Sequence, residues 1–89
     1  MEDKKAIQEA FGQVLVSLRK EKNLKQAELA ELSYMDVTYI SDLERGLYMP
    51  SLHTLLKLAQ GLGESFEEMA RKIEIKVNRN PDSDLGDMD

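Results

Sequence analysis

Residues 26–45 place two short apolar patterns on either side of a gap too short for anything but a turn. Both patterns have helical spacing: Leu29, Ala30 and Leu32 in the first, Ile40 and Leu43 in the second. Asp36 directly precedes the second pattern, where its carboxylate can accept hydrogen bonds from the free amides of a first helical turn. The stretch therefore predicts two short helices joined by a tight turn.

The second predicted helix has an apolar face on one side and small and polar side chains on the opposite side. The outward residues are Val37, Thr38, Ser41, Asp42 and Arg45. A helix that is anchored on one side and carries short polar groups on the other is suited to the major groove of DNA, where base edges expose donors and acceptors. The pattern therefore indicates a DNA-reading helix-turn-helix.

The segment 24–50 resembles the lambda Cro/repressor-like family of helix-turn-helix proteins, also called the XRE family. The matching elements are Gln26-x-x-Leu29-Ala30, Met35, Thr38-Tyr39-Ile40-Ser41, Leu43-Glu44-Arg45-Gly46 and Pro50-Ser51. The likeness extends over about residues 6–74, and Asp36-x-Thr38-Tyr39-Ile40-Ser41 is most similar to controller proteins of restriction–modification systems. It implies an all-α, five-helix lambda repressor-like domain in residues 1–79, with the helix-turn-helix at about 25–45.

The resemblance gives Gln26 a phosphate-contacting role at the start of the first of these two helices, where free amides also favour anions. Val37 and Thr38 are expected to enter the groove first: Thr38 can hydrogen-bond a base edge, and both can pack on a thymine methyl. Relatives often have arginine at the position of Val37. The guanine contact that such an arginine makes is therefore absent here.

Further positions of the expected interface have two readings each. Tyr39 either bonds a phosphate or packs beside the turn, and Ser41 is either a donor at the groove edge or a solvated serine. Asp42 either accepts from cytosine N4 or repels phosphates. Arg45 and Lys25 are available to contact the DNA backbone as cations, or are solvated charges.

One pair is expected to serve the fold. In relatives, the positions of Arg19 and Glu44 form an internal salt bridge between the first helix and the recognition helix. Glu44 follows the inward Leu43, so a buried Glu44 would need an opposite charge beside it.

The first helix is predicted over about residues 5–22. Gly12 lies inside it at a cost of about 1 kcal/mol against alanine, which indicates a close approach of another backbone. Lys25 stands where many relatives have a capping Ser or Thr, so either Asn23 caps the next helix or that helix is poorly capped. Tyr34 stands where relatives usually have a turn glycine. A tyrosine at positive φ is unusual, so the turn is expected to be either slightly strained or differently shaped.

Two more helices are predicted after the recognition helix. Ser51 is expected to cap a helix that ends near Leu62, with inward residues Leu52, Leu55, Leu56, Ala59 and Leu62. Ser65 is expected to start a fifth helix over about 65–77, although residues 73–77 also alternate with the period of a strand. Its apolar residues either form an isologous dimer interface or close the monomer's core: Phe66, Met69, Ile73 and Val77.

The net charge of −5 is unusual for a DNA-binding protein, but it is unevenly distributed. Residues 80–89 contain Asp82, Asp84, Asp87 and Asp89 and no basic residue, which predicts a disordered acidic tail. The remaining residues 1–79 are nearly neutral. Such a body can bind DNA if its basic groups face the phosphates.

Several classes of function are disfavoured. The chain has no cysteine and one histidine, His53, so thiolate metal sites and triad chemistry are not expected. We see neither paired carboxylates in a pocket nor a glycine-rich phosphate loop, so we expect no enzyme, cofactor, metal or small-molecule substrate. No apolar run is long enough to span a bilayer and the charged N-terminus lacks a signal-peptide pattern, so a cytoplasmic protein is expected.

Two functions remain. The first is a sequence-specific transcriptional regulator, a repressor or autoregulator that binds double-stranded DNA as a homodimer on a pseudo-palindromic operator. The second is a protein-binding antirepressor or antitoxin-like module, which the net charge and the thin base-reading face would suit. Salt-dependent binding to duplex DNA separates them.

Overall fold

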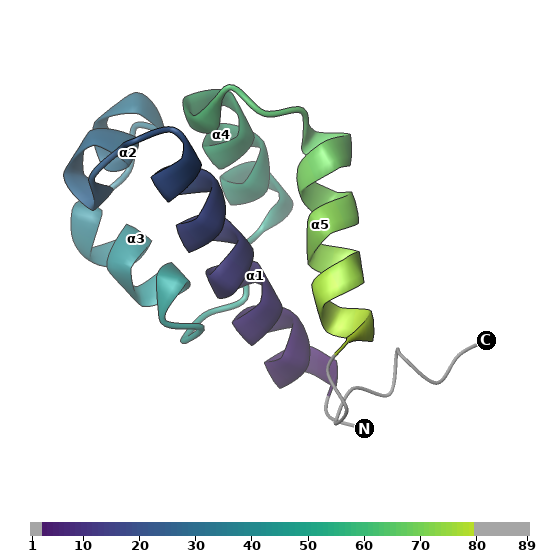
Figure 1. Cartoon of the computed structure of the whole chain (residues 1–89). Coiled ribbons are helices and arrows are strands. Elements are labelled where there is room, and N and C mark those ends of the chain that lie inside the picture. The colour runs from purple at the N-terminus through teal and green to yellow at the C-terminus, as the bar shows by residue number, and fades with distance from the viewer. Residues whose placement is uncertain (1–2, 80–89) are drawn as a thin grey trace.

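The computed structural model describes residues 3–79, which form five helices (Figure 1). These are α1 (Asp3–Glu21), α2 (Gln26–Leu32), α3 (Val37–Glu44), α4 (Leu52–Leu62) and α5 (Phe66–Asn78). Helix α1 packs against α3 on one side and α5 on another, and α2 packs against both α3 and α4. The all-α, five-helix prediction is confirmed, and residues 3–79 contain no strand. The predicted acidic tail, residues 80–89, lies outside the described residues.

One hydrophobic core joins all five helices. Its fully buried side chains are Phe11, Leu15, Leu18, Leu29, Ile40, Leu43, Leu58 and Met69. The apolar stripe expected in α3, Ile40 and Leu43, is thus the buried face of that helix. Burial of this apolar surface is the main force that holds such short helices in place, because helices of 7 and 8 residues such as α2 and α3 are marginal alone.

Three leucines predicted to point inward are exposed. Leu52 and Leu56 of α4 are 61% and 46% exposed, and Leu32 at the end of α2 is 51% exposed. In α4 the core-facing stripe runs through Leu58, Ala59 and Leu62, and the helix has more leucines than this stripe can hold. The sequence pattern identified the helix correctly but not the part of its apolar surface that turns inward.

Gly12 marks the closest approach between α1 and α3. A Cβ atom at this position would lie 2.7 Å from the Glu44 carbonyl oxygen and 2.8 Å from that of Leu43. Carbon and oxygen atoms do not approach this closely, so only glycine fits. The predicted backbone approach is confirmed, and it brings the C-terminal end of α3 directly onto α1.

Three predicted helix caps are present. The Asp36 carboxylate accepts from the Thr38 amide at 2.7 Å, and the hydroxyls of Ser51 and Ser65 accept from amides three residues on at 3.0 Å each. Each cap satisfies one of the free amides at a helix start.

The start of α2 is capped differently from the expectation. Asn23 does not cap α2; at φ 58° it follows the end of α1. The Glu28 carboxylate accepts instead from the backbone amide of Lys25 at 2.7 Å. A lysine side chain cannot accept a hydrogen bond, so the residue three positions into the helix supplies the cap.

Tyr34, in the turn between α2 and α3, adopts the left-handed conformation, which agrees with the first of the two alternatives, a strained turn. Tyr34 has φ 56°, and the Met35 amide donates to the Ala30 carbonyl at 2.9 Å to close the turn. Lys57 of α4 donates to the Tyr34 carbonyl at 3.1 Å. The turn is therefore tied to a third helix, which helps to hold a tyrosine in a conformation that favours glycine.

Residues 73–77 belong to helix α5, in agreement with the favoured of the two alternatives. Ile73 and Val77 are four residues apart on one side and turn toward the interior, whereas Ile75 is 36% exposed. The alternation in the sequence thus reflects two faces of a helix. Within residues 3–79, no helix combines the length and apolarity needed to cross a membrane.

The contact at Gly12 predicts whether replacing this glycine by alanine stabilises or destabilises the protein. In an exposed helix, Gly→Ala stabilises by about 1 kcal/mol, because alanine is the better helix former. Gly12→Ala should instead destabilise by about 1–3 kcal/mol, because the new methyl group pushes α3 away from α1. Denaturant titration measures the difference, with Gln13→Ala at the exposed neighbouring position as control. A stabilised Gly12→Ala protein would show that α1 and α3 are not in contact there.

Candidate nucleic-acid interface

Helix α3 is anchored through its apolar face and leaves the opposite face accessible. Ile40 and Leu43 are completely buried, whereas Val37 is 42% exposed and Thr38 is exposed as well. Ser41 and Asp42 are half-buried, and Arg45 is exposed at the helix end. The five side chains expected to meet DNA therefore share an accessible surface, as the helical spacing requires.

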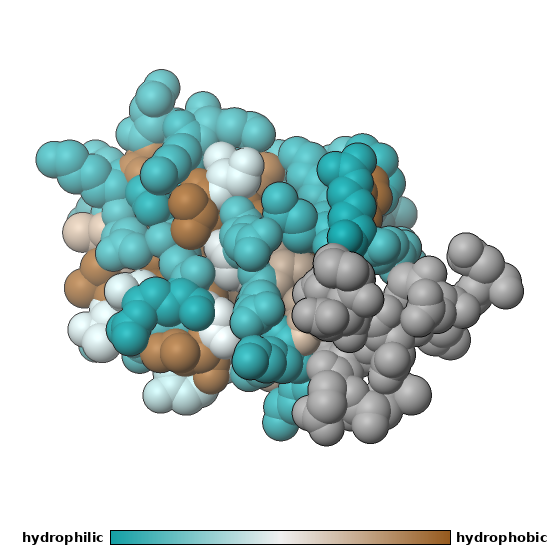
Figure 2. Space-filling view, turned by 60° about the horizontal axis from the view of Figure 1, so that its bottom comes forward, coloured by the Kyte–Doolittle hydropathy of each residue, from teal (hydrophilic) through white to brown (hydrophobic). Residues whose placement is uncertain are grey.

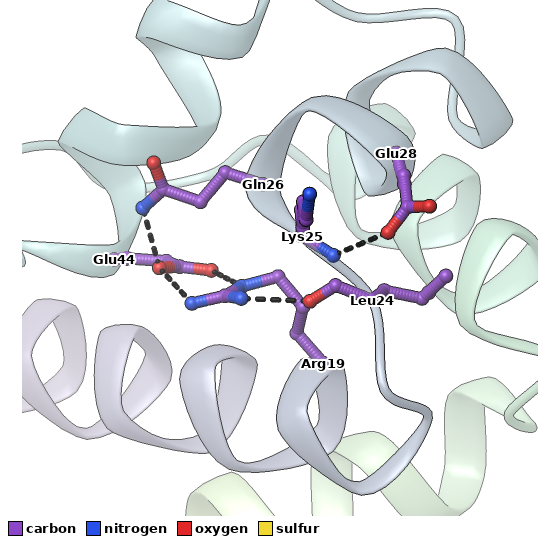
Figure 3. A network of polar contacts seen from close by, with 6 residues as sticks. All are labelled: Arg19, Leu24, Lys25, Gln26, Glu28 and Glu44. Carbon is purple, nitrogen blue, oxygen red and sulfur yellow. Dashed lines mark hydrogen bonds and ion pairs between the residues drawn. The ribbon is translucent and has the colours of Figure 1, made fainter.

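A buried polar network fixes the other end of this helix (Figure 3). Arg19 donates to Glu44 through Nε at 2.6 Å and Nη2 at 3.1 Å, a two-point contact between α1 and α3. The third guanidinium nitrogen, Nη1, donates to the Leu24 carbonyl at 2.8 Å. The side chains of Arg19 and Glu44 are only 12% and 5% exposed. Two-point geometry with few unmet donors is the condition under which a buried ion pair is tolerated.

Gln26 belongs to the same network. Its side-chain amide nitrogen donates to Glu44 Oε1 at 2.8 Å, which ties the start of α2 to the end of α3 (Figure 3). The sequence predicted the Arg19–Glu44 pair but not this third member. Because one amide hydrogen is used within the protein, the second hydrogen remains for a phosphate, and the glutamine can serve fold and ligand together.

The charges at the end of α3 are paired with each other. Arg45 Nη1 lies 3.3 Å from Asp42 Oδ1, and the two side chains are 66% and 23% exposed. The pairing partly cancels the repulsion that Asp42 would exert on a phosphate. An exposed pair of this kind is worth less than about 1 kcal/mol, so Arg45 can leave it at small cost. Lys25 is also exposed, beside the start of α2.

Tyr39 is partly buried and packs on one side against the core. Its ring is half-buried against the core and meets the ring of Tyr48, with centroids 6.1 Å apart and planes inclined by 40°. A shallow groove beside α3 is lined by Asp36, Thr38, Tyr39, Asp42, Tyr48 and Met49. Tyr48 and Met49 were not among the expected site residues. The signal for them was the run of large apolar residues Leu47–Met49 in a loop.

The expected dimer residues of α5 divide into two groups. Met69 and Val77 are 0% and 2% exposed, and for these two residues the burial agrees with the second alternative, that they close the core of the single chain. Phe66 and Ile73 are half-buried and line an apolar groove with Ile7, Leu55 and Ala70. A helix of this length has more than one apolar stripe, and the sequence alone did not separate them.

The hydrophobic residues on the face shown in Figure 2 are interrupted by hydrophilic ones and do not form a continuous patch. Among the described residues, no group of three or more His, Cys, Asp or Glu side chains is arranged to hold a metal ion. The features that remain for function are therefore the outward face of α3, the groove beside it and the groove along α5.

The protein belongs to the helix-turn-helix family, whose pattern matches residues 15–69, more than half of the chain. This segment contains the whole of α2, α3 and α4 and all four members of the buried network.

Two proteins of Bacillus phage phi105 are similar to this chain. The ImmF control region 10 kDa protein is 48% identical over 49 residues, which are 55% of this chain and 54% of that protein. The immunity repressor protein is 44% identical over 52 residues, which are 58% of this chain and 36% of the repressor. The chain thus spans about half and about a third of the lengths of these relatives.

Solved structures of controller proteins share the fold. The restriction–modification controller protein C.AhdI of Aeromonas hydrophila superimposes with a TM-score of 0.68 at 42% identity, covering 70% of this chain and 94% of that one. The controller protein C.Esp1396I, as a tetramer in complex with its natural 35 base-pair operator, superimposes with a TM-score of 0.67 at 31% identity, covering 75% and 93%.

The buried network predicts strong coupling between its members. Arg19→Ala and Glu44→Ala should each destabilise by about 3 kcal/mol, because each leaves a buried charge without its partner. The double variant should cost far less than the sum of the two. Denaturant titration of the three variants measures the coupling.

The exposed pair Asp42 and Arg45 is the matched control. The same double-mutant cycle there should give a coupling below about 1 kcal/mol. Equal coupling energies at the two pairs would contradict the buried character of the Arg19–Glu44 contact.

Proposed function

We propose that this protein is a sequence-specific transcriptional regulator that binds double-stranded DNA with α3 in the major groove. It acts in the cytoplasm without a cofactor, as a repressor or autoregulator. The observation that carries the proposal is the accessible face of α3, held on a rigid frame by the buried contacts of Glu44. The fold shared with an operator-bound controller protein supports it.

The accessible side chains divide into two roles. In this proposal Thr38 and Val37, which are exposed at the first turn of α3, meet base edges by a hydrogen bond and by apolar contact respectively. Arg45, Lys25 and the second amide hydrogen of Gln26 meet phosphates. Phosphate contacts set the position of the protein on the duplex, and base contacts set the sequence.

The functional unit in this proposal is a homodimer on a pseudo-palindromic operator. One copy of a small helix-turn-helix module offers a limited contact with DNA, and two-fold pairing doubles the readout. The groove of about 610 Å³ along α5 offers a surface for pairing, because its lining is largely apolar and includes Phe66, Leu55 and Ala70. Apolar surface of this kind is stabilised when a second copy covers it.

Charged side chains at the edge of this groove suit a self-complementary contact. Glu67, Arg71 and Glu74 line it together with the apolar residues. Arg71 is paired with Glu68, and their hydrogen bond and charge attraction hold the pKa of Glu68 below its usual range. In an isologous interface the same patch of both copies is in contact, and every contact occurs twice. An acidic group on the patch of one copy can therefore pair with a basic group on the patch of the other. The exposed Leu52 and Leu56 extend the apolar surface of α4 that includes Leu55.

Substitutions at the two kinds of DNA contact should have different effects. Thr38→Ala should weaken binding to the preferred duplex by about 1–3 kcal/mol, have little effect on random duplex, and relax one base pair per half-site. Arg45→Ala should weaken both, and reduce the slope of log K against log salt by about one unit per lost phosphate contact. Binding isotherms across a salt series, on a site selected from a random pool, measure both effects.

Val37→Arg provides the converse test on the same helix. It should strengthen binding to sites with a guanine at the facing position and shift the preferred sequence there, because arginine can bond guanine O6 and N7 together. If the wild-type protein showed no salt-sensitive binding to any duplex, the proposed function would be wrong and the protein-binding alternative would replace it.

Two variants test the dimer, each of which introduces a negative charge on a different face of α5. Phe66 lies in the apolar groove at the first turn of α5, where the helix dipole favours an acidic side chain, and Phe66→Glu is to be checked for an intact fold by circular dichroism. It should convert a dimer into a folded monomer in sedimentation analysis. Ile75→Glu, on a different face of α5, should leave the dimer intact. A dimer that survives Phe66→Glu and dissociates with Ile75→Glu would locate the interface elsewhere.

A further inference from the structure

The loop after the recognition helix exposes more apolar surface than a loop of a small protein usually does. Leu47, Tyr48 and Met49 are 49%, 50% and 38% exposed, and they follow one another directly. The start of the loop is tied to the end of α3, because the Leu47 amide donates to the Asp42 carbonyl at 3.1 Å. Large apolar residues that remain accessible beside a ligand-binding surface indicate a role at that surface.

The side chain of Tyr48 contacts the recognition helix. Its ring meets that of Tyr39 with centroids 6.1 Å apart and a tilt of 40°, a separation at which aromatic rings attract each other. The Tyr39 ring also packs against the hydrophobic core. Held by the core and by Tyr48, the Tyr39 side chain has little freedom to rotate.

The pair lines the groove beside α3 together with Thr38, the expected base reader. The phenol of Tyr39 therefore lies close to the surface that would face the duplex. A tyrosine hydroxyl can donate to a phosphate oxygen, and such contacts fix the register of a recognition helix on DNA. The value of that contact depends on how closely the ring is held, since an unrestrained side chain loses rotational freedom on binding.

We propose that Tyr48 is a positioning residue for DNA binding: it holds the Tyr39 ring so that its hydroxyl donates to a phosphate at the edge of the major groove. The inference rests on the proposed DNA-binding function and specifies one of its contacts. Tyr48 acts through Tyr39 and makes no essential hydrogen bond with its own hydroxyl. The ligand group is a backbone phosphate, so the effect is expected on preferred and random duplex alike.

A double-mutant cycle on the full chain tests the proposal. Tyr39→Phe removes the hydroxyl but keeps the ring pair, and Tyr48→Ala removes the ring pair but keeps the hydroxyl. Each should weaken binding to the selected duplex roughly tenfold, the scale of a hydrogen bond to a charged group. In the Tyr39→Phe background, Tyr48→Ala should have little further effect, because both changes remove the same contact.

Three other variants exclude a role that is merely structural. Tyr48→Phe keeps the ring and should bind like the wild-type protein. Tyr48→Leu keeps apolar volume in the loop but not the aromatic pair, so it should bind as weakly as Tyr48→Ala while remaining as stable as the wild type in denaturant titration. Tyr34→Ala removes the ring that is 87% exposed in the turn and should leave binding unchanged.

The outcomes separate this inference from the function on which it rests. Absence of wild-type binding to any duplex would overturn the proposed function itself. If the wild type binds DNA, the positioning role is overturned by wild-type affinity in Tyr48→Ala, or by multiplicative losses in the double variant. Weak binding of Tyr48→Phe would also overturn it, since it would make Tyr48 a direct contact.

Discussion

The contact between Arg19 and Glu44 is the interaction on which the arrangement of the helix-turn-helix depends. A carboxylate with only 5% of its side chain exposed is costly unless its charge is paired and its oxygens accept hydrogen bonds. Arg19 supplies the charge, and Gln26 donates a further bond at 2.8 Å. Glu44 also ends α3, where a negative charge opposes the helix dipole, so the arginine offsets two unfavourable effects together. Three segments that are separate in sequence are thus required to meet at one group, and α3 can lie in only one way.

Helix α3 is fixed by contacts at its C-terminal end and along its buried face, so the side chains of its other face are not needed for the fold. Val37, Thr38 and Ser41 are absent from the core and from the Glu44 network. Their side chains can therefore vary with little effect on folding, and sequence preference can change while the frame stays constant. Gly12 strengthens this separation, because it lets the backbone of α1 pack directly against that of α3. A Cβ atom at Gly12 would lie 2.7–2.8 Å from two carbonyl oxygens of α3, so the support comes from the buried side of α3 and adds no side chain to its outer surface.

The local parts of the fold were predictable from the sequence, and the parts that depend on helix crossing were not. The cap at Asp36 follows from a signal within a few residues, and it is present. The resemblance left two shapes open for the turn at Tyr34, and the residue is left-handed. The orientation of an apolar helix depends on where its neighbours cross it. For that reason Leu56 was expected inward and is exposed, and the sequence could not decide whether Met69 lies in a dimer surface or, as its burial indicates, in the core. The bond from Gln26 to Glu44 joins residues 18 positions apart, and no local pattern encodes it. At the candidate interface, the sequence identified the exposed residues of α3 but missed the loop beside it.

The charge of the protein sets how it would recognise DNA. With a net charge of −5, the chain cannot depend on a broad positive field to concentrate it on the duplex. Asp42 brings a negative charge to the recognition helix itself, and its pairing with Arg45 at 3.3 Å leaves that end of α3 nearly neutral. Few phosphate contacts imply weak non-specific binding and a shallow dependence on salt. Specific affinity then has to come from base contacts, from aromatic and apolar groups beside α3, and from the doubling that a two-fold partner provides. If the proposed function holds, such an acidic regulator would gain discrimination because it has little attraction for the rest of the genome, and loss of either the proposed dimer or its base contacts would leave almost nothing to hold it on DNA.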